Sequence, residues 1–504
     1  MKRNLCSKYL IIAVATLLFF SIFSSVATSE ILKSDIQSDK ILITINESKS
    51  GSAPIEVWVD DDYYDGGYNG GHTWGYDAFD NIQDGVDNVS DDGTVHVYEG
   101  TYDVFKIEGR FDIILEAVDD EVPLVAGSQQ AWDSTASLMV NCVVFVNNSD
   151  NVYLKGLNIQ GIGLSGRSFA VYYTESTGTI NDCTVSPNQK GNMNNLGIRA
   201  HLNSTLSVEN CTVLNYGRIG IYIRTGTTLN AVSNKLIGQI YTDADGDYVS
   251  YGIEVEDLQY ASHATIRYNE IYNHDHTGNP TWSSAGIIVD TWRYYQVTSE
   301  NCSAIIEYNN IHDNMLGVQI VPNENIHMNR NKIHHHSSHG AVSDPYWDGT
   351  TYVYYNLDAE NNWWGDPTGP FHPTENPDGL GDEITDYVLF EPWIEHSDPI
   401  VNITTPENGF LYVNFRDIIV FKLPFFTNLI IGKIEVEADA PDCLFGIDRV
   451  EFYVDDVLQT TDYTEPYSWT WDELELLFFY TIKVVAYDNA GNSAVDDIGV
   501  WKFL

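Results

Sequence analysis

The sequence has 504 residues, with 72 Asp and Glu against 25 Lys and Arg, and a formal net charge of −47. A chain of this length exceeds one ordinary hydrophobic core, so we expect two or more folding units. The charge argues against nucleic acid and anionic membrane surfaces as partners. It suits divalent cations, high-salt surroundings or simply a solvated outer surface. Its apolar fraction of 43% argues against wholesale disorder.

The first 28 residues have the order of a secretory signal. Lys2 and Arg3 precede an apolar run at 9–23, and small residues follow at 24–27. The run is long enough for an uncleaved membrane anchor, which stays open as an alternative. We therefore predict a secreted or cell-surface protein, with 1–28 as the signal or anchor and 29–54 as a linker. Asn-x-Ser/Thr sequons are candidate glycosylation sites in such a chain, although several are expected by chance in an Asn-rich sequence. They begin at Asn46, Asn88, Asn147, Asn203, Asn210, Asn301 and Asn402.

The cysteines predict neither a disulfide framework nor a structural zinc site. Once Cys6 is set aside with the signal, an odd and widely spread set remains. No Cys-x-x-Cys pair is present in the sequence, so the spacing of a structural zinc site is missing.

Two short phrases alternate between about residues 143 and 364. The first phrase, mostly an Asn before alternating apolar residues, recurs at 156–159, 181–185, 210–213, 234–237, 269–271, 309–311 and 331–333. The second begins with a glycine and an apolar residue, at Gly197, Gly220, Gly252, Gly286, Gly317 and Gly340. Each phrase returns after roughly 22 to 40 residues, a period typical of solenoids.

The phrases alternate apolar and polar residues, which is strand periodicity. Strands this short bury their apolar side chains only when coil stacks on coil in parallel, so we predict a parallel β-helix with one pair of strands per coil. We expect the Asn side chains to form a ladder between coils, and the glycines to bend the chain before the next strand.

The ends of the β-helix can be located from the sequence. Apolar residues at helical spacing in Ala78–Val86 predict a short lid over the first coil. The segments at 58–62 and 93–102 resemble the entry of pectate-lyase-like right-handed β-helix proteins, and 361–370 resembles the closing segment of archaeal and bacterial surface β-helix proteins. This resemblance implies a right-handed β-helix over 55–396. It leaves the chemistry open, because the family includes lyases, epimerases, carbohydrate binders and adhesins.

Residues 399–504 predict a separate β-sandwich. Alternating segments at 399–406, 434–438, 447–455, 467–471 and 481–487 read as strands, and 488–492 is a turn cluster. The segment resembles the immunoglobulin-like modules of prokaryotic surface proteins, which implies a spacer or adhesive unit.

Two kinds of catalytic candidate stand out. Lyases of this fold need a basic residue near the sugar, and Arg218 and Arg224 lie within one phrase, although solvated outward positions explain them as well. Aligning the first phrase by its Ile places Tyr272, His312 and His334 on successive coils, with Asp313 and His335 beside them. This polar patch can act as a general base or metal site, and a solvated turn ladder is the other interpretation.

The sequence also offers candidate Ca²⁺ ligands and candidate sugar-binding residues. Asp243, Asp245 and Asp247 have the alternating spacing of a Ca²⁺ loop, and the carboxylates at 60–62 offer a second cluster. Aromatic rings stack on sugars, which makes a set of Tyr and Trp residues candidate ligand contacts: Tyr222, Tyr251, Trp282, Trp292 and Tyr294.

The sequence favours an exported β-helix protein without catalysis, one that binds a cell-surface polysaccharide or contributes to adhesion and surface architecture with neighbouring proteins. The alternative is a carbohydrate-active enzyme, a polysaccharide lyase or uronate epimerase acting on acidic glycans. The two predict different surfaces. A groove along one sheet with a basic residue beside a carboxylate favours the enzyme, and a flat face rich in Asn and Tyr favours binding.

Overall fold

The computed structural model describes residues 52–503, apart from 120, 134–136, 189–193, 242–248, 257–259, 277–282, 291–301, 322–324, 348–349, 396, 415–417, 423–427, 441–443, 474–477 and 490. The predicted signal segment lies outside these residues. Within them, no helix has the length and apolar character needed to cross a membrane.

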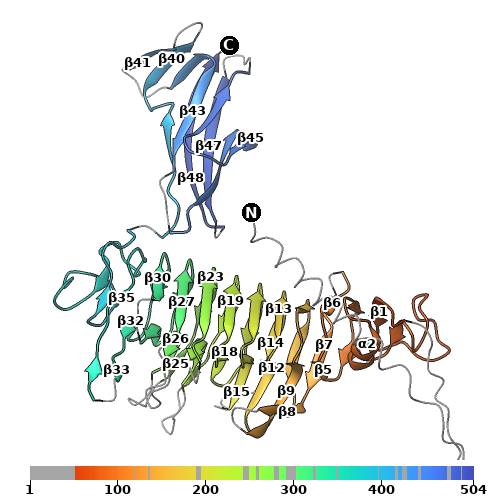
Figure 1. Cartoon of the computed structure of the whole chain (residues 1–504). Helices are drawn as coiled ribbons and strands as arrows, with labels where there is room; N and C mark the ends of the chain where they lie inside the picture. Colours follow the sequence, from red (N-terminus) through yellow and green to blue (C-terminus); the bar gives the residue numbers. More distant parts are fainter. Residues whose placement is uncertain are drawn as a thin grey trace, which may run out of the picture. The chain divides into compact units, whose positions relative to one another are not determined.

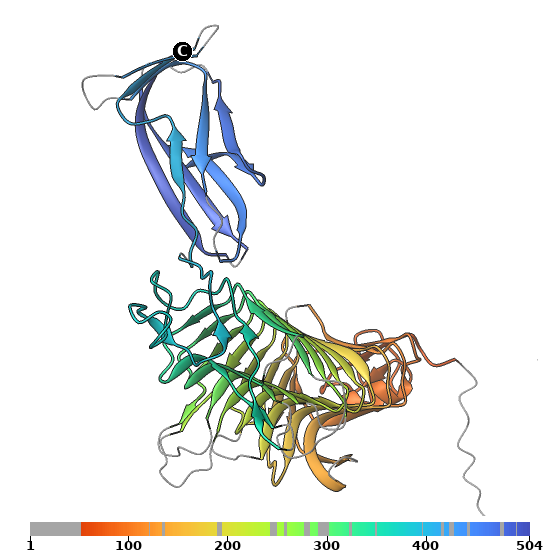
Figure 2. The same ribbon diagram turned by 60° about the vertical axis from the view of Figure 1, so that its left-hand side comes forward.

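The N-terminal part of the described chain is a parallel β-helix with three sheets (Figures 1 and 2). The first sheet runs in the order β2 (Ala78–Phe79), β1 (Glu56–Val59), β3 (Thr94–Val97), β6 (Ile114–Ala117), β10 (Val152–Lys155), β13 (Thr177–Asn181), β16 (Thr205–Glu209), β19 (Thr228–Val232), β23 (His263–Arg267), β27 (Ser303–Glu307), β30 (Ile326–Asn329), β35 (Leu357–Asp358) and β38 (Val388–Leu389). The second runs β4 (Thr101–Tyr102), β7 (Leu124–Gly127), β11 (Asn158–Gly161), β14 (Thr184–Ser186), β17 (Thr212–Leu214), β20 (Lys235–Ile237), β24 (Glu270–Tyr272), β28 (Asn310–His312) and β31 (Lys332–His334).

The third sheet runs β5 (Phe105–Glu108), β9 (Leu138–Asn147), β12 (Ser168–Thr174), β15 (Asn195–His201), β18 (Ile219–Arg224), β22 (Tyr251–Glu256), β26 (Ala285–Asp290), β29 (Leu316–Ile320) and β32 (His339–Ser343), with β8 (Gln129–Asp133) antiparallel to β9. Short pairs lie in the connections: β21 (Ile240–Tyr241) with β25 (Asp275–His276), β33 (Tyr346–Trp347) with β34 (Tyr352–Val353), and β36 (Pro370–Phe371) with β37 (Gly381–Glu383).

Each coil therefore contributes three strands, and the expectation of two was wrong. The two phrases form the second and third sheets. The strands of the first sheet, such as β19 and β23, precede each Asn and place only two apolar residues inward. Inward Ile, Val and Leu side chains from all three sheets form one continuous core, and Trp364 in the closing segment is fully buried.

The predicted Asn ladder is confirmed. Asn309 accepts a hydrogen bond at its Oδ1 from the backbone N–H of Asn269, 3.0 Å away, and donates its Nδ2 to the carbonyl oxygen of Ile266 at 2.8 Å. Asn234, Asn331 and Asn362 repeat this arrangement on their own coils. A buried amide thus satisfies backbone groups of two coils at once, which fixes the register of the stack.

The glycines of the second phrase do not bend the chain, contrary to expectation. They lie inside strands of the third sheet and stack on one another. A Cβ at Gly252 would lie 2.5 Å from the carbonyl oxygen of Gly286, and one at Gly286 would lie 2.8 Å from that of Gly317. Glycine is required here because neighbouring coils approach too closely for a side chain.

The predicted lid is present, but its helix starts later. α2 spans Ile82–Asn88 and is capped by the side chain of Asn81, which accepts from the N–H of Asp84. The preceding residues, Ala78–Phe79, form β2 and extend the first sheet. Ile82 and Val86 are buried in the core, so the helix covers its first coil.

The C-terminal module is a β-sandwich with its own core. One sheet contains β39 (Asn402–Thr405), β43 (Ile434–Asp439) and β46 (Tyr467–Trp471). The other runs β41 (Ile418–Lys422), β40 (Phe410–Asn414), β42 (Leu429–Gly432), β48 (Ser493–Phe503), β47 (Phe478–Asp488), β44 (Ile447–Val454) and β45 (Val457–Asp462). Val436, Phe452, Trp471 and Ile482 pack between them.

Candidate functional site

The outer side of the third sheet carries an uninterrupted column of one residue per coil. Tyr172 pairs with Arg199, Arg199 with Tyr222, Tyr222 with Glu254, and Glu254 with Ile288 in the parallel register. Stacked coils lie about 4.8 Å apart, so these side chains are neighbours. The strands β12, β15 and β22 are buried at every position, which takes this outer side out of water as well.

Arg199 anchors one end of the site. Its Nη1 donates to Oδ2 of Asp133 at 2.7 Å, and both side chains are fully buried. The guanidinium carbon also lies 4.9 Å from the ring centroid of Phe169 and 5.4 Å from that of Tyr172. Removing an ion pair of this kind from water costs free energy, so stability alone is a weak explanation for its presence on the outer side of the sheet.

A cavity of about 280 Å³ opens beside this pair. It is lined by Arg167, Asn194, Leu196, Arg218, Ile219, Tyr222 and Glu254. Burial lowers the pKa of Arg167, and the nearby charge of Arg199 lowers it further. Like charges are therefore held together at the cavity, a situation that a bound anion relieves.

Glu254 is the acidic group of the cavity. Burial raises its pKa to about 7, Arg218 opposes the shift, and Glu256 adds to it. Its Oε2 is buried with no hydrogen-bond partner among the described residues. For Arg218, burial lowers the pKa, but Glu254 and its other neighbours outweigh this and raise it. Near neutral pH, Glu254 is therefore poised between its neutral and ionised forms, the condition that suits a proton-transfer group.

Glu256 lies two residues further along β22, on the same side of the strand. It accepts a hydrogen bond from the hydroxyl of Tyr222, and its Oε2 lies 3.4 Å from Nε of Arg224. The two carboxyls thus have different surroundings: Glu256 is held by a phenol and a guanidinium, whereas an oxygen of Glu254 has no partner.

A neutral histidine closes the site on the Arg199 side. Burial lowers the pKa of His201 to about 3, with a further contribution from Arg199. Its Nε2 lies 2.5 Å from the hydroxyl of Tyr172, whose own pKa is raised by burial. The protonated phenol therefore donates to the unprotonated Nε2.

Arg218 and Arg224, for which the sequence left a solvated position open, are half-buried. Arg218 lines the cavity, and Arg224 lies beside Glu256. Tyr222 and Tyr251, which the sequence suggested as sugar contacts, are each only 5% exposed, and Tyr222 lines the cavity. They pack in the apolar layer on the outer side of the third sheet and lie against Arg199 and Arg218 at 5.6 and 5.8 Å. Three further aromatic candidates lie outside the described residues: Trp282, Trp292 and Tyr294.

The histidine column lies on the second sheet. Tyr272, His312 and His334 stack on successive coils, as the alignment of phrases predicted, with ring centroids 5.0 and 5.3 Å apart. Asp313 and His335 follow with left-handed φ angles of 52° and 61°, so they form a turn ladder.

The chemistry of this column fits a turn better than a reaction centre. Nδ1 of His312 pairs with Oδ2 of Asp313 at 2.7 Å, and Nδ1 of His334 lies 3.0 Å from that of His335. Burial lowers the pKa of His334 to about 3, and the charges of His335 and His312 contribute. Among the described residues, these side chains do not bring three ligand atoms together.

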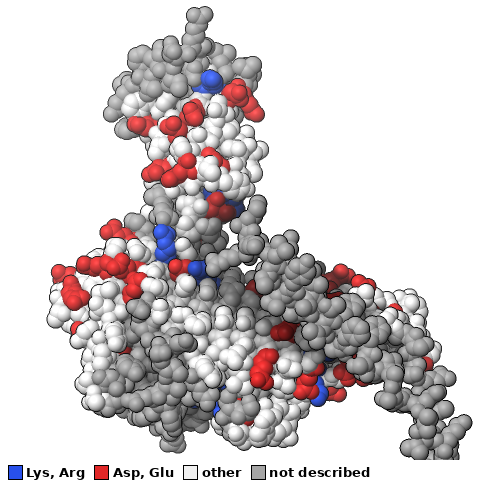
Figure 3. Space-filling view, in the orientation of Figure 1, with Lys and Arg blue, Asp and Glu red and all other residues white. Residues whose placement is uncertain are grey.

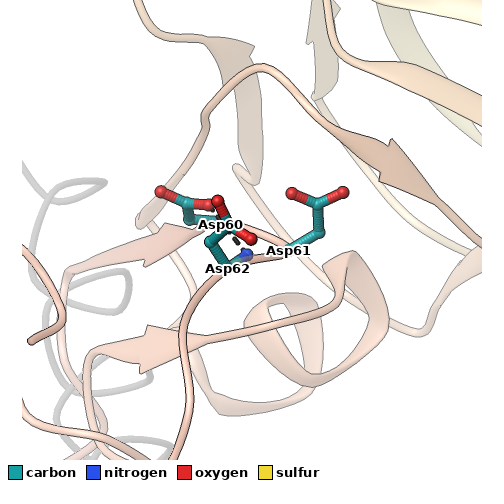
Figure 4. A group of neighbouring side chains, drawn as sticks. All are labelled: Asp60, Asp61 and Asp62. Atoms are coloured by element: carbon teal, nitrogen blue, oxygen red, sulfur yellow. Dashed lines mark hydrogen bonds between the residues drawn. The ribbon is translucent and has the colours of Figure 1, made fainter. Parts of the chain in front are cut away.

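One acidic cluster does bring three ligand atoms together. Carboxylate oxygens of Asp60, Asp61 and Asp62 lie within 4.8 Å of one another (Figure 4). Asp61 already accepts the N–H of Thr101 at 2.9 Å, and Asp60 accepts that of Asp62 at 3.0 Å. These contacts explain the cluster as a turn at the entry of the β-helix. The predicted calcium ligands Asp243, Asp245 and Asp247 lie outside the described residues.

The structure brings Glu254, Arg167, Asp133 and His201 to the site, and the sequence argument had missed all four. A signal for one of them was available. The third residue of each second phrase points outward. Aligning these positions gives Arg199, Tyr222 and Glu254 in one column, so Glu254 could have been found. Asp133 had no such signal, because the hairpin of β8 on β9 brings it there.

Comparisons with known proteins agree with this architecture. Residues 131–304 match the model for a right-handed β-helix region, and 427–495 match that for a bacterial Ig domain. The chain is therefore a right-handed parallel β-helix protein that carries a C-terminal immunoglobulin-like domain. A search of curated proteins found no significant match.

Three solved structures illustrate the range of similar chains. The fibronectin(III)-like modules of Clostridium thermocellum CbhA are 22% identical, with 21% of this chain and 100% of that chain covered and a TM-score of 0.16. A pectin methylesterase variant in complex with a hexasaccharide is 10% identical, with 66% and 93% covered and a TM-score of 0.29. Tailspike protein 2 of bacteriophage CBA120 is 12% identical, with 84% and 64% covered and a TM-score of 0.30.

Proposed function

We propose that this chain is an exported surface protein that binds an acidic glycan at the outer side of the third sheet. The observation that carries the proposal is the cavity where Arg167 and Arg218 meet Tyr222 and Glu254. Guanidinium groups bind carboxylates in paired, planar geometry, and an aromatic ring beside them suits the apolar face of a sugar.

The charge of the whole chain sharpens this argument. Acidic side chains far outnumber basic ones on the face drawn in Figure 3, in keeping with the net charge of −47. Such a surface repels polyanions in general. The cavity, by contrast, is lined by two guanidinium groups, those of Arg167 and Arg218, and by one carboxyl, that of Glu254, whose pKa is about 7. A local excess of positive charge on an acidic protein favours recognition of a specific carboxylate.

The fold supports the surface role. A β-helix offers a long, rigid face on which successive coils present side chains at a fixed spacing, and a bacterial Ig domain follows it. Both features suit a protein that works outside the cell, and the signal-like order of residues 1–28 agrees with export.

A binding experiment tests the proposal. The purified protein is titrated with uronate polymers (polygalacturonate and alginate) and with the neutral polymer dextran. Loss of one charged hydrogen bond costs about 1.5–3 kcal/mol, so Arg218→Ala should weaken uronate binding by roughly 10- to 150-fold. The matched control is Arg267→Ala, which removes an arginine paired with Glu307 on the first sheet. Equal binding of dextran, or equal loss in both variants, would refute the proposal.

A second candidate function is catalysis at the same site. Arg218 and Glu254 both line the cavity. A basic residue beside a carboxylate in a groove is the feature expected of an enzyme from the sequence, as opposed to a flat binding face. This pairing favours a reaction over a purely adhesive role.

A further inference from the structure

We propose that Glu254 is a proton switch for binding: a carboxylate ligand enters the cavity when Glu254 is protonated and is repelled when Glu254 is ionised. Binding of the ligand therefore takes up a proton. This inference rests on the proposed function, because it requires a carboxylate in the cavity, and it adds how that binding is regulated.

Two side chains that line the cavity carry buried polar atoms with incomplete hydrogen bonds. Glu254 is 7% exposed, and its Oε2 has no partner among the described residues. Nε of Arg218 is likewise buried and has no partner among them. Buried polar atoms of folded proteins are usually paired, and an unpaired one costs free energy. A ligand in the cavity can complete the hydrogen bonds of both groups.

The chemistry of a carboxylate ligand decides which form of Glu254 it accepts. An ionised carboxylate has acceptors only. The guanidinium of Arg218 is always a donor, whereas the carboxyl of Glu254 donates only when it carries a proton. With Glu254 ionised, two carboxylates would face each other without a hydrogen between them, and their like charges repel. A protonated Glu254 instead donates to the ligand and leaves Arg218 to pair with the same carboxylate.

The charged neighbours of Glu254 place its change of state near neutral pH. Burial raises the pKa of Glu254 to about 7. Arg218 opposes this shift and Glu256 adds to it, while Arg224 and Arg167 also oppose it. These guanidinium groups stay charged at any pH at which the protein is folded, so they do not contribute a titration of their own.

The groups on the neighbouring coils do not titrate near neutral pH either. Tyr222 and Ile288 are the register partners of Glu254. Burial raises the pKa of Tyr222 well above its ordinary value, and the charge of Glu256 contributes. On the strand beyond Tyr222, burial lowers the pKa of His201 to about 3. Both groups are therefore neutral throughout the range in which Glu254 changes charge.

Calorimetric titration with polygalacturonate and alginate, at about pH 6 and about pH 8 and constant ionic strength, measures the effect. Ordinary carboxylic acids have pKa values of about 4, so the polymers carry the same charge at both pH values. With a pKa of about 7, the protonated fraction of Glu254 falls from about nine-tenths to about one-tenth between them. Because Kd scales inversely with the fraction that is competent to bind, we expect binding to be about tenfold weaker at the higher pH.

Two matched variants separate Glu254 from other carboxyls. Glu254→Gln is neutral at both pH values and keeps a donor, so its Kd should be the same at both. Glu307→Gln removes a carboxyl that pairs with Arg267 on the first sheet, and it should keep the tenfold difference. Retention of the tenfold difference in Glu254→Gln would overturn the switch.

A second measurement uses the unaltered protein alone. Titrations at about pH 8 in two buffers of different ionisation enthalpy give the number of protons taken up, and we expect about one per bound carboxylate. Equal Kd values at the two pH values, tighter binding at the higher one, or absence of proton uptake would each overturn the switch and leave the proposed function standing. Absence of binding to both polymers at both pH values would overturn the proposed function as well.

Discussion

The Asn ladder makes a quantitative prediction about stability. In Asn309→Leu the branching and the number of side-chain heavy atoms are kept but the amide is lost. The backbone N–H of Asn269 loses its acceptor at 3.0 Å, and the carbonyl oxygen of Ile266 loses a donor at 2.8 Å. Each buried group left without a partner costs about 1–3 kcal/mol, so we expect the free energy of unfolding to fall by about 4 kcal/mol. The side chains of Asn269 and Asn331 lose one bond each but keep others.

Equilibrium urea denaturation, followed by far-UV circular dichroism and tryptophan fluorescence, measures this change. Asn310→Ala is the control, since Asn310 is half-exposed and, among the described residues, the hydrogen bond of its side chain is to the ring of His334. We expect less than about 0.5–1 kcal/mol there. A loss below 1 kcal/mol in Asn309→Leu, with an unchanged slope in urea, would show that the ladder sets register without contributing stability.

Three further predictions concern buried groups. The pKa of Glu254 rises on folding from 4.5 to about 7, so the folded state binds more protons between these values, and stability falls as pH rises through them by roughly 3 kcal/mol. Glu254→Gln should lack this fall in parallel pH-dependent urea titrations, and identical curves would contradict it. Gly286→Ala should lower the free energy of unfolding by about 1–3 kcal/mol, because its Cβ meets the carbonyl oxygen of Gly317 at 2.8 Å; an unchanged urea midpoint would count against the close packing of coils. Burial raises the pKa of the Cys142 thiol to about 12 and also raises that of Cys183, so peptide mapping should find both unlabelled by a thiol reagent until the protein unfolds, and labelling in the native state would count against this.

Much of the β-helix could be predicted from the sequence because its core obeys local rules. From Asn234 to Asn331, an Asn at one turn and a Leu or Ile two residues later recur on successive coils, and both positions are read directly from spacing. The first sheet escaped detection because its strands, such as His263–Arg267, carry only two small or branched apolar residues among polar ones. The glycines were misinterpreted for a related reason: a glycine required by close packing of coils has the same sequence signature as one required by a turn.

The site was harder to predict because its members come from different coils and from outside the repeat. Arg199, Tyr222 and Glu254 are neighbours only through the parallel register, and Asp133 reaches Arg199 across 66 positions of sequence. Sequence spacing also favoured the histidines as a catalytic or metal site, since three of them are consecutive in the sequence at 334–336. Their turn geometry, which sequence spacing does not reveal, accounts for that cluster.

The outward column on the third sheet gives these strands a second buried side. Each coil places one residue in the column, and its two neighbours on the strand point into the core, as Ile253 and Val255 do beside Glu254. A substitution in the column therefore leaves these inward residues in place, but it alters a second apolar layer, in which Tyr172, Tyr222 and Ile288 are buried on the outer side of the sheet. The third sheet is therefore packed on both sides, so a change of ligand at the column would also have to preserve this outer packing.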